Sequence, residues 1–116
     1  MTTLAELLKK KCRHLETGLT NAEIDTHLAL VNGWSFNERK IVKTFTFKNY
    51  YETLAFINAI AYLIHAEDHH PELITTYNRC IVKFDTHSVN DGKGGISEND
   101  FICAAKVDAI FAQSVA

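Results

Sequence analysis

Four of the six histidines lie between positions 65 and 87: His65, His69, His70 and His87. His69 and His70 directly precede Pro71, the only proline, and His87 follows a run with the pattern of a strand. An imidazole is present in both protonation states near neutral pH because its ordinary pKa is about 6.5. We therefore expect His69, His70 and His87 to meet at one cleft, where one ring donates a proton and another accepts one.

Two alternatives for these histidines stay open. A histidine at the edge of a helix or strand is often a surface residue without a chemical role. Metal binding is the second alternative, since His65 and His69 have the i, i+4 spacing with which two histidines on one helical face bind zinc. That pattern is incomplete, because Ala66 stands where metalloproteases carry a glutamate. We therefore place metal binding behind proton transfer and expect no metal site.

Composition narrows the class of protein. The formal net charge is −2 and 22% of the 116 residues are charged, so direct nucleic-acid binding through a basic surface is not expected. Three widely spaced cysteines, Cys12, Cys80 and Cys103, form no CxxC pair, which predicts a reducing compartment and no disulfide framework. No apolar run approaches the ~20 residues that span a bilayer, and the N-terminus lacks the features of a secretory signal. We expect a single domain over residues 1–116, in the cytoplasm.

Helical spacing predicts two helices before the first strand. In the N-terminal arm, residues 1–18, the apolar positions are Leu4, Leu7, Leu8 and Leu15. We expect Gly18 to end this helix. Thr20 and Glu23 form a capping box that begins the second helix, and Gly33 is expected at its C-terminal end.

Two predicted hairpins follow, one on each side of a long helix. Alternation of apolar and polar residues predicts the first hairpin over 34–47, with its turn at 37–39. The same alternation predicts a strand from 73 to 77, a turn at 78–79 and a strand from 80 to 87.

The helix between the hairpins is expected to run from position 49 to about 68 and to end because Pro71 cannot continue it. Its apolar residues form two stripes, one of Leu54, Ile57, Ala61 and Ile64 and one of Phe56, Ile60 and Leu63. One stripe must cover the sheet, and we expect the other to contact a second copy of the chain.

The last predicted helix begins at Ser97-x-x-Asp100, which has the form of a capping box. The order helix, hairpin, helix, hairpin, helix predicts an α+β fold, in which a four-stranded antiparallel sheet has three main helices packed on one face, with the helix of the arm in addition. Val82 and Phe84 share one face of the last strand, so His87, of opposite parity, is expected on the open face.

The spacing of several of these residues resembles the signature of the pterin-4a-carbinolamine dehydratases: His65, His69, His70, Pro71, Tyr77, His87 and Asp100. The stretches FTFKNYYETLAFINAIA and GGISENDF are similar to segments of the same family, and the resemblance covers residues 19–116. It implies a hydro-lyase that converts 4a-hydroxytetrahydrobiopterin to quinonoid dihydrobiopterin and water, in the recycling of tetrahydrobiopterin. It also implies that no metal or organic cofactor takes part.

The resemblance assigns roles to nine residues: His69, His70 and His87 as catalytic, Asp68, Thr86 and Ser88 as substrate-binding, and His65, Tyr77 and Asp100 as supporting. We expect His69 and His87 to transfer protons and His70 to orient or stabilise charge. Asp100 has the alternative of serving only as the capping partner of Ser97. Many members of the family carry a glutamate where this chain has His65, which leaves the tuning of the site open. Glu67, two positions along the helix, is expected to face away from the site.

A different class of function also follows from the resemblance. Some animal members bind a homeodomain transcription factor through the helix that otherwise forms their tetramer. The apolar helix at 49–66 would allow such a coactivator role, and a nuclear location with it. Association into a homodimer or homotetramer explains the same apolar stripe without a second partner, and we favour it.

Overall fold

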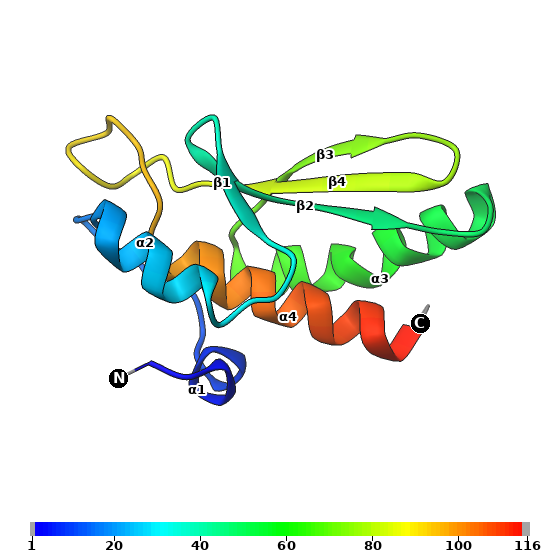
Figure 1. The fold of residues 1–116 in the computed structure, drawn as a ribbon, viewed down its shortest axis with the longest axis horizontal. Helices are drawn as coiled ribbons and strands as arrows, with labels where there is room; N and C mark the ends of the chain where they lie inside the picture. Colours follow the sequence, from blue (N-terminus) through cyan, green and yellow to red (C-terminus); the bar gives the residue numbers. More distant parts are fainter. Residues whose placement is uncertain (1, 115–116) are drawn as a thin grey trace.

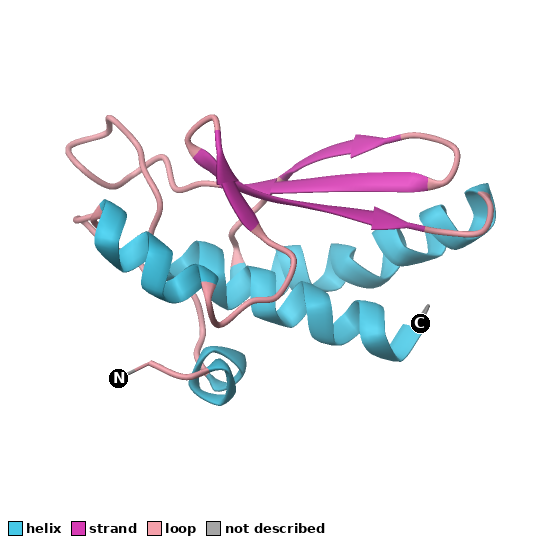
Figure 2. Ribbon diagram, viewed as in Figure 1, coloured by secondary structure: helices cyan, strands magenta, loops and turns pink. Residues whose placement is uncertain are grey.

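Four strands form one antiparallel sheet, and the helices lie on one face of it (Figure 1, Figure 2). The structure is a computed structural model that describes residues 2–114. The helices are α1 (Leu4–Lys9), α2 (Asn21–Leu28), α3 (Tyr50–Glu67) and α4 (Glu98–Ser114), and the strands are β1 (Ser35–Asn37), β2 (Lys40–Thr46), β3 (Glu72–Thr75) and β4 (Arg79–Phe84). This arrangement confirms the predicted α+β fold. The short α1 packs against α4 on the side away from the sheet (Figure 1).

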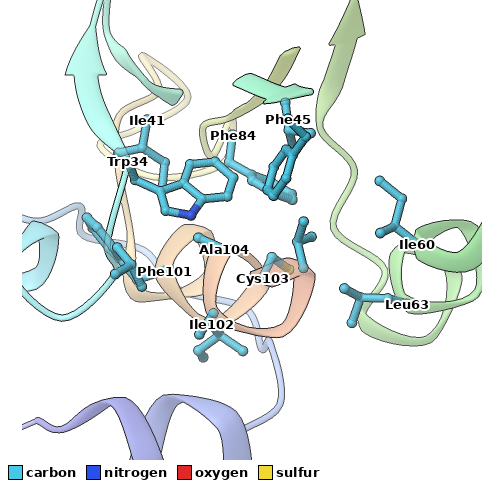
Figure 3. Close-up of a cluster of buried hydrophobic side chains, with 14 of the residues drawn as sticks. Trp34, Ile41, Phe45, Ile60, Leu63, Phe84, Phe101, Ile102, Cys103 and Ala104 are labelled. Carbon is cyan, nitrogen blue, oxygen red and sulfur yellow. The ribbon is translucent and has the colours of Figure 1, made fainter. Parts of the chain in front are cut away.

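The two hairpins join through their inner strands, giving the order β1-β2-β4-β3. In the register of β2 and β4, Ile41 lies opposite Phe84 and Phe45 opposite Cys80. These four side chains and Val82 are buried beneath the helices. Figure 3 shows part of the resulting core, in which side chains of the sheet meet those of α3 and α4. Each buried aromatic ring of this kind contributes about 2 to 3 kcal/mol to folding.

The first hairpin has its turn where the sequence predicted it. Glu38 and Arg39 connect β1 to β2, and both have left-handed backbone, with φ of 51° and 68°. Two successive left-handed residues form the turn type that matches the twist of a two-residue hairpin.

The second hairpin differs from the prediction by a few residues. The N–H of Thr76 donates to the carbonyl of Arg79 at 2.9 Å, so the turn lies at 76–78 and Tyr77 belongs to it, not to β3. β4 ends at Phe84 and does not reach His87. Beyond it, Thr86 forms an isolated bridge with Gly95, since the glycine-rich loop folds back on the end of the strand.

Asp68, not Pro71, ends α3. Asp68 adopts left-handed backbone with φ of 50°, and its N–H donates to the carbonyl of His65 at 3.2 Å. A left-handed residue after the last turn is a common helix end. His69 and His70 therefore lie beyond the helix.

The N-terminal arm is less helical than predicted. α1 ends at Lys9, so Leu15 lies outside it, and Gly18 does not end a helix. α2 does begin with the predicted capping box, in which Thr20 and Glu23 bond reciprocally. It ends earlier than expected, at Leu28, and Gly33 follows in a turn with φ of 88°. Between residues 2 and 114, no helix has both the length and the hydropathy that crossing a membrane requires.

Candidate active site

His69 is held in a fixed orientation at the end of the sheet. Its ring stacks on that of Phe84, with centroids 5.8 Å apart and planes at 6°. Its Nε2 lies 2.6 Å from Oδ1 of Asp100, in the first turn of α4. The side chain is 13% exposed, so one edge of the imidazole still reaches solvent.

Asp100 is fully buried and joins the helix start to the histidine. Its Oδ2 accepts hydrogen bonds from the N–H of Ser97 at 2.8 Å and from the hydroxyl of Thr86 at 2.9 Å. It is therefore both the predicted capping partner of Ser97 and the partner of His69. Because this carboxylate only accepts, the proton on His69 belongs to Nε2, and Nδ1 is the nitrogen left for chemistry.

The hydroxyl groups of Thr86 and Ser97 form an ordered hydrogen-bond network around Asp100. Thr86 Oγ1 lies 2.7 Å from Ser97 Oγ, and Ser97 Oγ accepts from the N–H of Asn99 at 3.2 Å. Thr86 gives its single hydroxyl hydrogen to Asp100, so Ser97 must donate to Thr86. A fully satisfied buried network of this kind resists rearrangement and holds the carboxylate in place.

His70 and His87 form a second, exposed pair. Their ring centroids are 6.5 Å apart, with the planes at 31°. Val82, Phe84 and Thr86 are buried on the helix side, whereas His87 is exposed, as its parity predicted. The three predicted catalytic histidines are thus gathered at one end of the sheet, in two groups.

The pocket at His69 has a volume of about 460 Å³, and its walls come from four parts of the chain. Its lining residues are Cys12, Arg13, His14, Glu67, Asp68, His69, Thr86, Ser88 and Asn99. All three predicted substrate-binding residues are in this set. His70 and His87 are not in this set. His87 instead lines a separate pocket of about 230 Å³ with residues of the β1–β2 turn and the glycine-rich loop.

Two predicted supporting residues lie apart from this pocket. His65 is exposed on α3, and α3 ends before His69, so the two histidines do not share a helical face. Within residues 2–114 no group of three or more His, Cys, Asp or Glu side chains is arranged to hold a metal ion. Tyr77 lies at the opposite end of the β3–β4 hairpin, where its ring stacks on that of Tyr50 at 6.3 Å.

Sequence reasoning missed the arm residues of the pocket and the acid that holds them. Glu67 does not face away from the site: it is 8% exposed and accepts a hydrogen bond from the Cys12 N–H at 2.7 Å. Burial opposes ionisation of Glu67, but hydrogen bonds from Lys106 and from that N–H outweigh it, and its pKa lies below the ordinary 4.5. The one available signal of this role was the charge of Glu67, at the C-terminal end of the largely apolar α3.

A family profile, curated relatives and a crystal structure all relate this chain to one family. The sequence profile of the family described as "Pterin 4 alpha carbinolamine dehydratase" matches residues 17–110. A Bdellovibrio bacteriovorus protein, provisionally named pterin-4-alpha-carbinolamine dehydratase, is 59% identical over 95% of this chain and 92% of its own length. A Nitrosomonas europaea protein with the same provisional name is 46% identical over 96% of this chain and 98% of its own. The crystal structure of a Brucella melitensis protein, described as a transcriptional coactivator/pterin dehydratase, matches with a TM-score of 0.74 and 32% identity, over 81% of this chain and 98% of that one.

Proposed function

The chain belongs to the pterin 4 alpha carbinolamine dehydratase family, and we propose that it removes water from 4a-hydroxytetrahydrobiopterin to give quinonoid dihydrobiopterin during tetrahydrobiopterin recycling. The observation that carries this proposal is the 2.6 Å contact between His69 and the buried Asp100, at a pocket that Asp68, Thr86 and Ser88 also line. A pocket of about 460 Å³ is within the size range of small-molecule sites.

The reaction needs one proton donor and one proton acceptor. The bond from C4a to its hydroxyl oxygen breaks, and the oxygen takes a proton and leaves as water. The N5–H bond gives its proton to a base, and its electron pair forms the C4a=N5 double bond. Histidine can serve in either role near neutral pH.

We assign one transfer to Nδ1 of His69, because its Nε2 is engaged by Asp100. Asp100 is then a positioning residue that holds the imidazole in one tautomer and one orientation. We assign the other transfer to His87 and an orienting role to His70. His87 lies between Thr86 and Ser88, which both line the His69 pocket, so its backbone is at the pocket rim. Its imidazole lines the separate pocket of about 230 Å³, so this assignment requires the ring to turn toward the substrate.

Purified protein should accelerate the loss of absorbance of the 4a-hydroxy adduct. His69→Ala should lower kcat by about 10²-fold, the usual contribution of a general acid or base. His65→Ala is the matched control, since this exposed histidine lines neither pocket, and it should leave the rate unchanged. A His69→Ala variant that folds and retains the wild-type rate contradicts the mechanism.

The exposed side of α3 favours a second role for the chain. Phe56, Ile60 and Leu63 face the core, whereas Leu54 is 37% and Tyr62 is 77% exposed. We propose that this side joins copies of the chain into a dimer or tetramer. The description of the Brucella protein as a coactivator makes a protein partner on the same face the alternative. Both roles are compatible with dehydration in the pocket at His69.

A further inference from the structure

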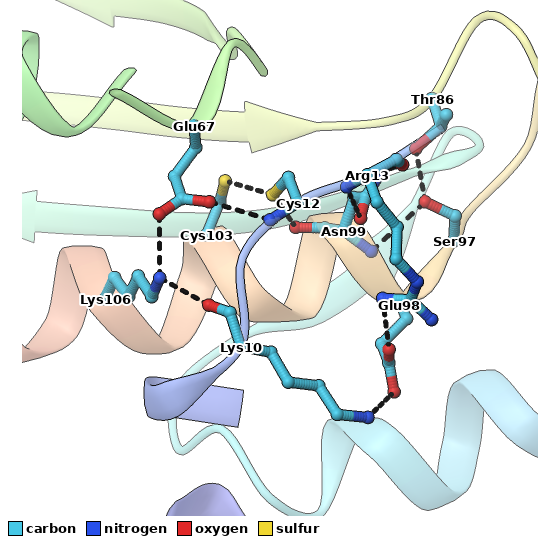
Figure 4. Close-up of polar contacts among 10 residues, drawn as sticks. All are labelled: Lys10, Cys12, Arg13, Glu67, Thr86, Ser97, Glu98, Asn99, Cys103 and Lys106. Atoms are coloured by element: carbon cyan, nitrogen blue, oxygen red, sulfur yellow. Dashed lines mark hydrogen bonds and ion pairs between the residues drawn. The ribbon is translucent and has the colours of Figure 1, made fainter. Parts of the chain in front are cut away.

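Residues 10–13 of the N-terminal arm are held in place by buried or half-buried side chains of α3 and α4 (Figure 4). Asn99, 6% exposed, accepts from the N–H of Arg13 at 3.2 Å and donates to its carbonyl at 2.6 Å. Glu67 holds the N–H of Cys12, and Lys106 donates both to Glu67 at 2.7 Å and to the carbonyl of Lys10 at 2.5 Å. Buried polar groups need such partners. The arm is therefore an integral part of the pocket.

Farther along, the arm is attached to the glycine-rich loop. The N–H of Asn90 donates to the carbonyl of Glu16 at 2.8 Å, and the side-chain oxygen of Asn90 accepts from the N–H of Gly18 at 3.0 Å. The approach is close, because a Cβ on Gly18 would lie 2.9 Å from Asn90 Nδ2. The amide nitrogen of Asn90 in turn donates to the carbonyl of Gly94 at 3.4 Å.

This part of the arm forms a wall of a further pocket, here called the arm pocket. The arm pocket has a volume of about 410 Å³ and shares His14 and Ser88 with the pocket at His69. Its remaining lining residues are Glu16, Thr17, Asn90 and Asp91. The amide of Asn90 is already engaged, whereas no hydrogen bond within residues 2–114 uses the side-chain oxygens of the other three.

We propose that the arm selects the pterin: the ring binds beside His69, and a neutral, hydroxylated substituent at C6 extends past His14 to Glu16 and Thr17. This inference rests on the proposed function. A hydroxyl group is a hydrogen-bond donor, and the arm pocket offers the carboxylates of Glu16 and Asp91 and the hydroxyls of Thr17 and Ser88 as acceptors. The residues of the arm up to position 16 lie outside the segment that the family profile matches.

The same side chains disfavour an anionic substituent. A phosphate or carboxylate group would lie beside the carboxylates of Glu16 and Asp91, and like charges at short range repel. Specificity of this kind arises from an unfavourable contact with the wrong ligand as well as a favourable contact with the right one. We therefore expect weak binding of pterins whose C6 substituent carries a phosphate.

Calorimetric binding of stable 7,8-dihydropterins tests the inference without requiring catalysis. The probes differ only at C6, which carries a methyl group, a 1,2-dihydroxypropyl group or a phosphorylated form of the latter. The wild-type protein should bind the dihydroxypropyl compound about 10-fold more tightly than the methyl compound. Glu16→Ala and Thr17→Val should each reduce this ratio about 3-fold, and Glu16→Gln should improve binding of the phosphorylated compound.

Lys11→Ala is the matched control, because this exposed arm residue lines neither the pocket at His69 nor the arm pocket. It should leave all three affinities unchanged. Equal affinity for the methyl and dihydroxypropyl compounds, or an unchanged ratio in both Glu16→Ala and Thr17→Val, overturns the inference. A protein that shows the predicted preference but does not accelerate loss of the 4a-hydroxy adduct supports the inference and contradicts the proposed function.

Discussion

The imidazole of His69 and the carboxylate of Asp100 are separated by 31 positions in the chain, and their Nε2 and Oδ1 atoms lie 2.6 Å apart. His69 comes from the segment after α3 and Asp100 from the first turn of α4, so the β3–β4 hairpin and the glycine-rich loop separate them in the chain. The same carboxylate accepts from Ser97 and Thr86. One buried side chain therefore connects helix capping with the orientation of the histidine.

Asp100→Asn should lower kcat by about 10²-fold, because an amide can donate to Nε2 and so favour the wrong tautomer of His69. Steady-state rates with the 4a-hydroxy adduct provide the measurement. Asp108→Asn is the control, since Asp108 lies on the same helix but bonds Lys43 at 2.8 Å and Trp34 at 3.0 Å. It should lower stability and leave kcat unchanged. Equal rate losses in the two variants would show a general structural effect instead.

His70 and His87 should act as a unit. His87→Ala should reduce kcat by about 10²-fold, and His70→Ala by a smaller factor. The double variant should be no slower than His87→Ala, because an orienting residue has no effect once its partner is absent. Both side chains are exposed, so the free energy of unfolding should change by at most about 0.5 kcal/mol. Multiplicative rate losses would mean that the two rings act independently.

Stability should fall with acidification partly through Glu67. Its pKa is lower in the folded state than the ordinary 4.5, so it stabilises the fold above about pH 4.5 and loses this contribution as the pH falls through the folded value. Glu67→Gln should reduce the free energy of unfolding at pH 7 by about 1 to 3 kcal/mol and flatten its decline between about pH 5 and 3. Urea unfolding across this range measures both. Glu16→Gln, an exposed change on the arm, should have no effect.

Mild oxidation should connect the arm to α4. Cys12 Sγ lies 3.4 Å from Cys103 Sγ, whereas Cys80 is buried in the sheet. The hydrogen bond with Cys12 and burial raise the pKa of the Cys103 thiol, so the half-buried Cys12 should react first. Diamide should take two hydrogens from the pair and leave a disulfide closing a separation of 91 residues. The disulfide should raise the free energy of unfolding by about 2 to 4 kcal/mol.

Peptide mapping under non-reducing conditions identifies this disulfide. Cys12→Ser should abolish it, and Cys80→Ser should not. A disulfide that includes Cys80 would contradict the position of the arm, and so would three free thiols after treatment with diamide.

Self-association should depend on the exposed side of α3. Leu54→Glu would place a charge in an apolar contact between copies, and sedimentation should show a shift toward monomer at micromolar concentration. Ala22→Glu on α2 is the control for a new exposed charge and should leave the distribution unchanged. A wild-type protein that sediments as a monomer would exclude the proposed association.

Much of the fold could be predicted because its signals are local. The capping box at Thr20, the turn at Glu38 and Arg39, and the parity that separates His87 from Phe84 each depend on neighbouring residues alone. The shift of the second hairpin is a register effect, in which Tyr77 fits a strand pattern but the Thr76 hydrogen bond places it in the turn.

The end of α3 and the path of the N-terminal arm were not predicted correctly, for a different reason. A left-handed helix end is usually marked by glycine, and aspartate at position 68 gives only a weak signal of it. The arm after Lys9 has no periodicity that predicts its path, because its backbone is held by side chains distant in sequence, such as Asn99 and Glu67. Those contacts require α3 and α4 to be packed together, since Glu67 is on α3 and Asn99 on α4. Tertiary contacts of this kind cannot be read from spacing.

The left-handed bend at Asp68 also constrains the length of the connection to β3. Only four residues, 68 to 71, separate α3 from that strand, and the bend determines which of two adjacent histidines faces Asp100. Removing one residue would bring His70 into the place of His69 or pull β3 out of register. Among related sequences, insertions and deletions should therefore be absent from this connection and should accumulate in the glycine-rich loop around position 92.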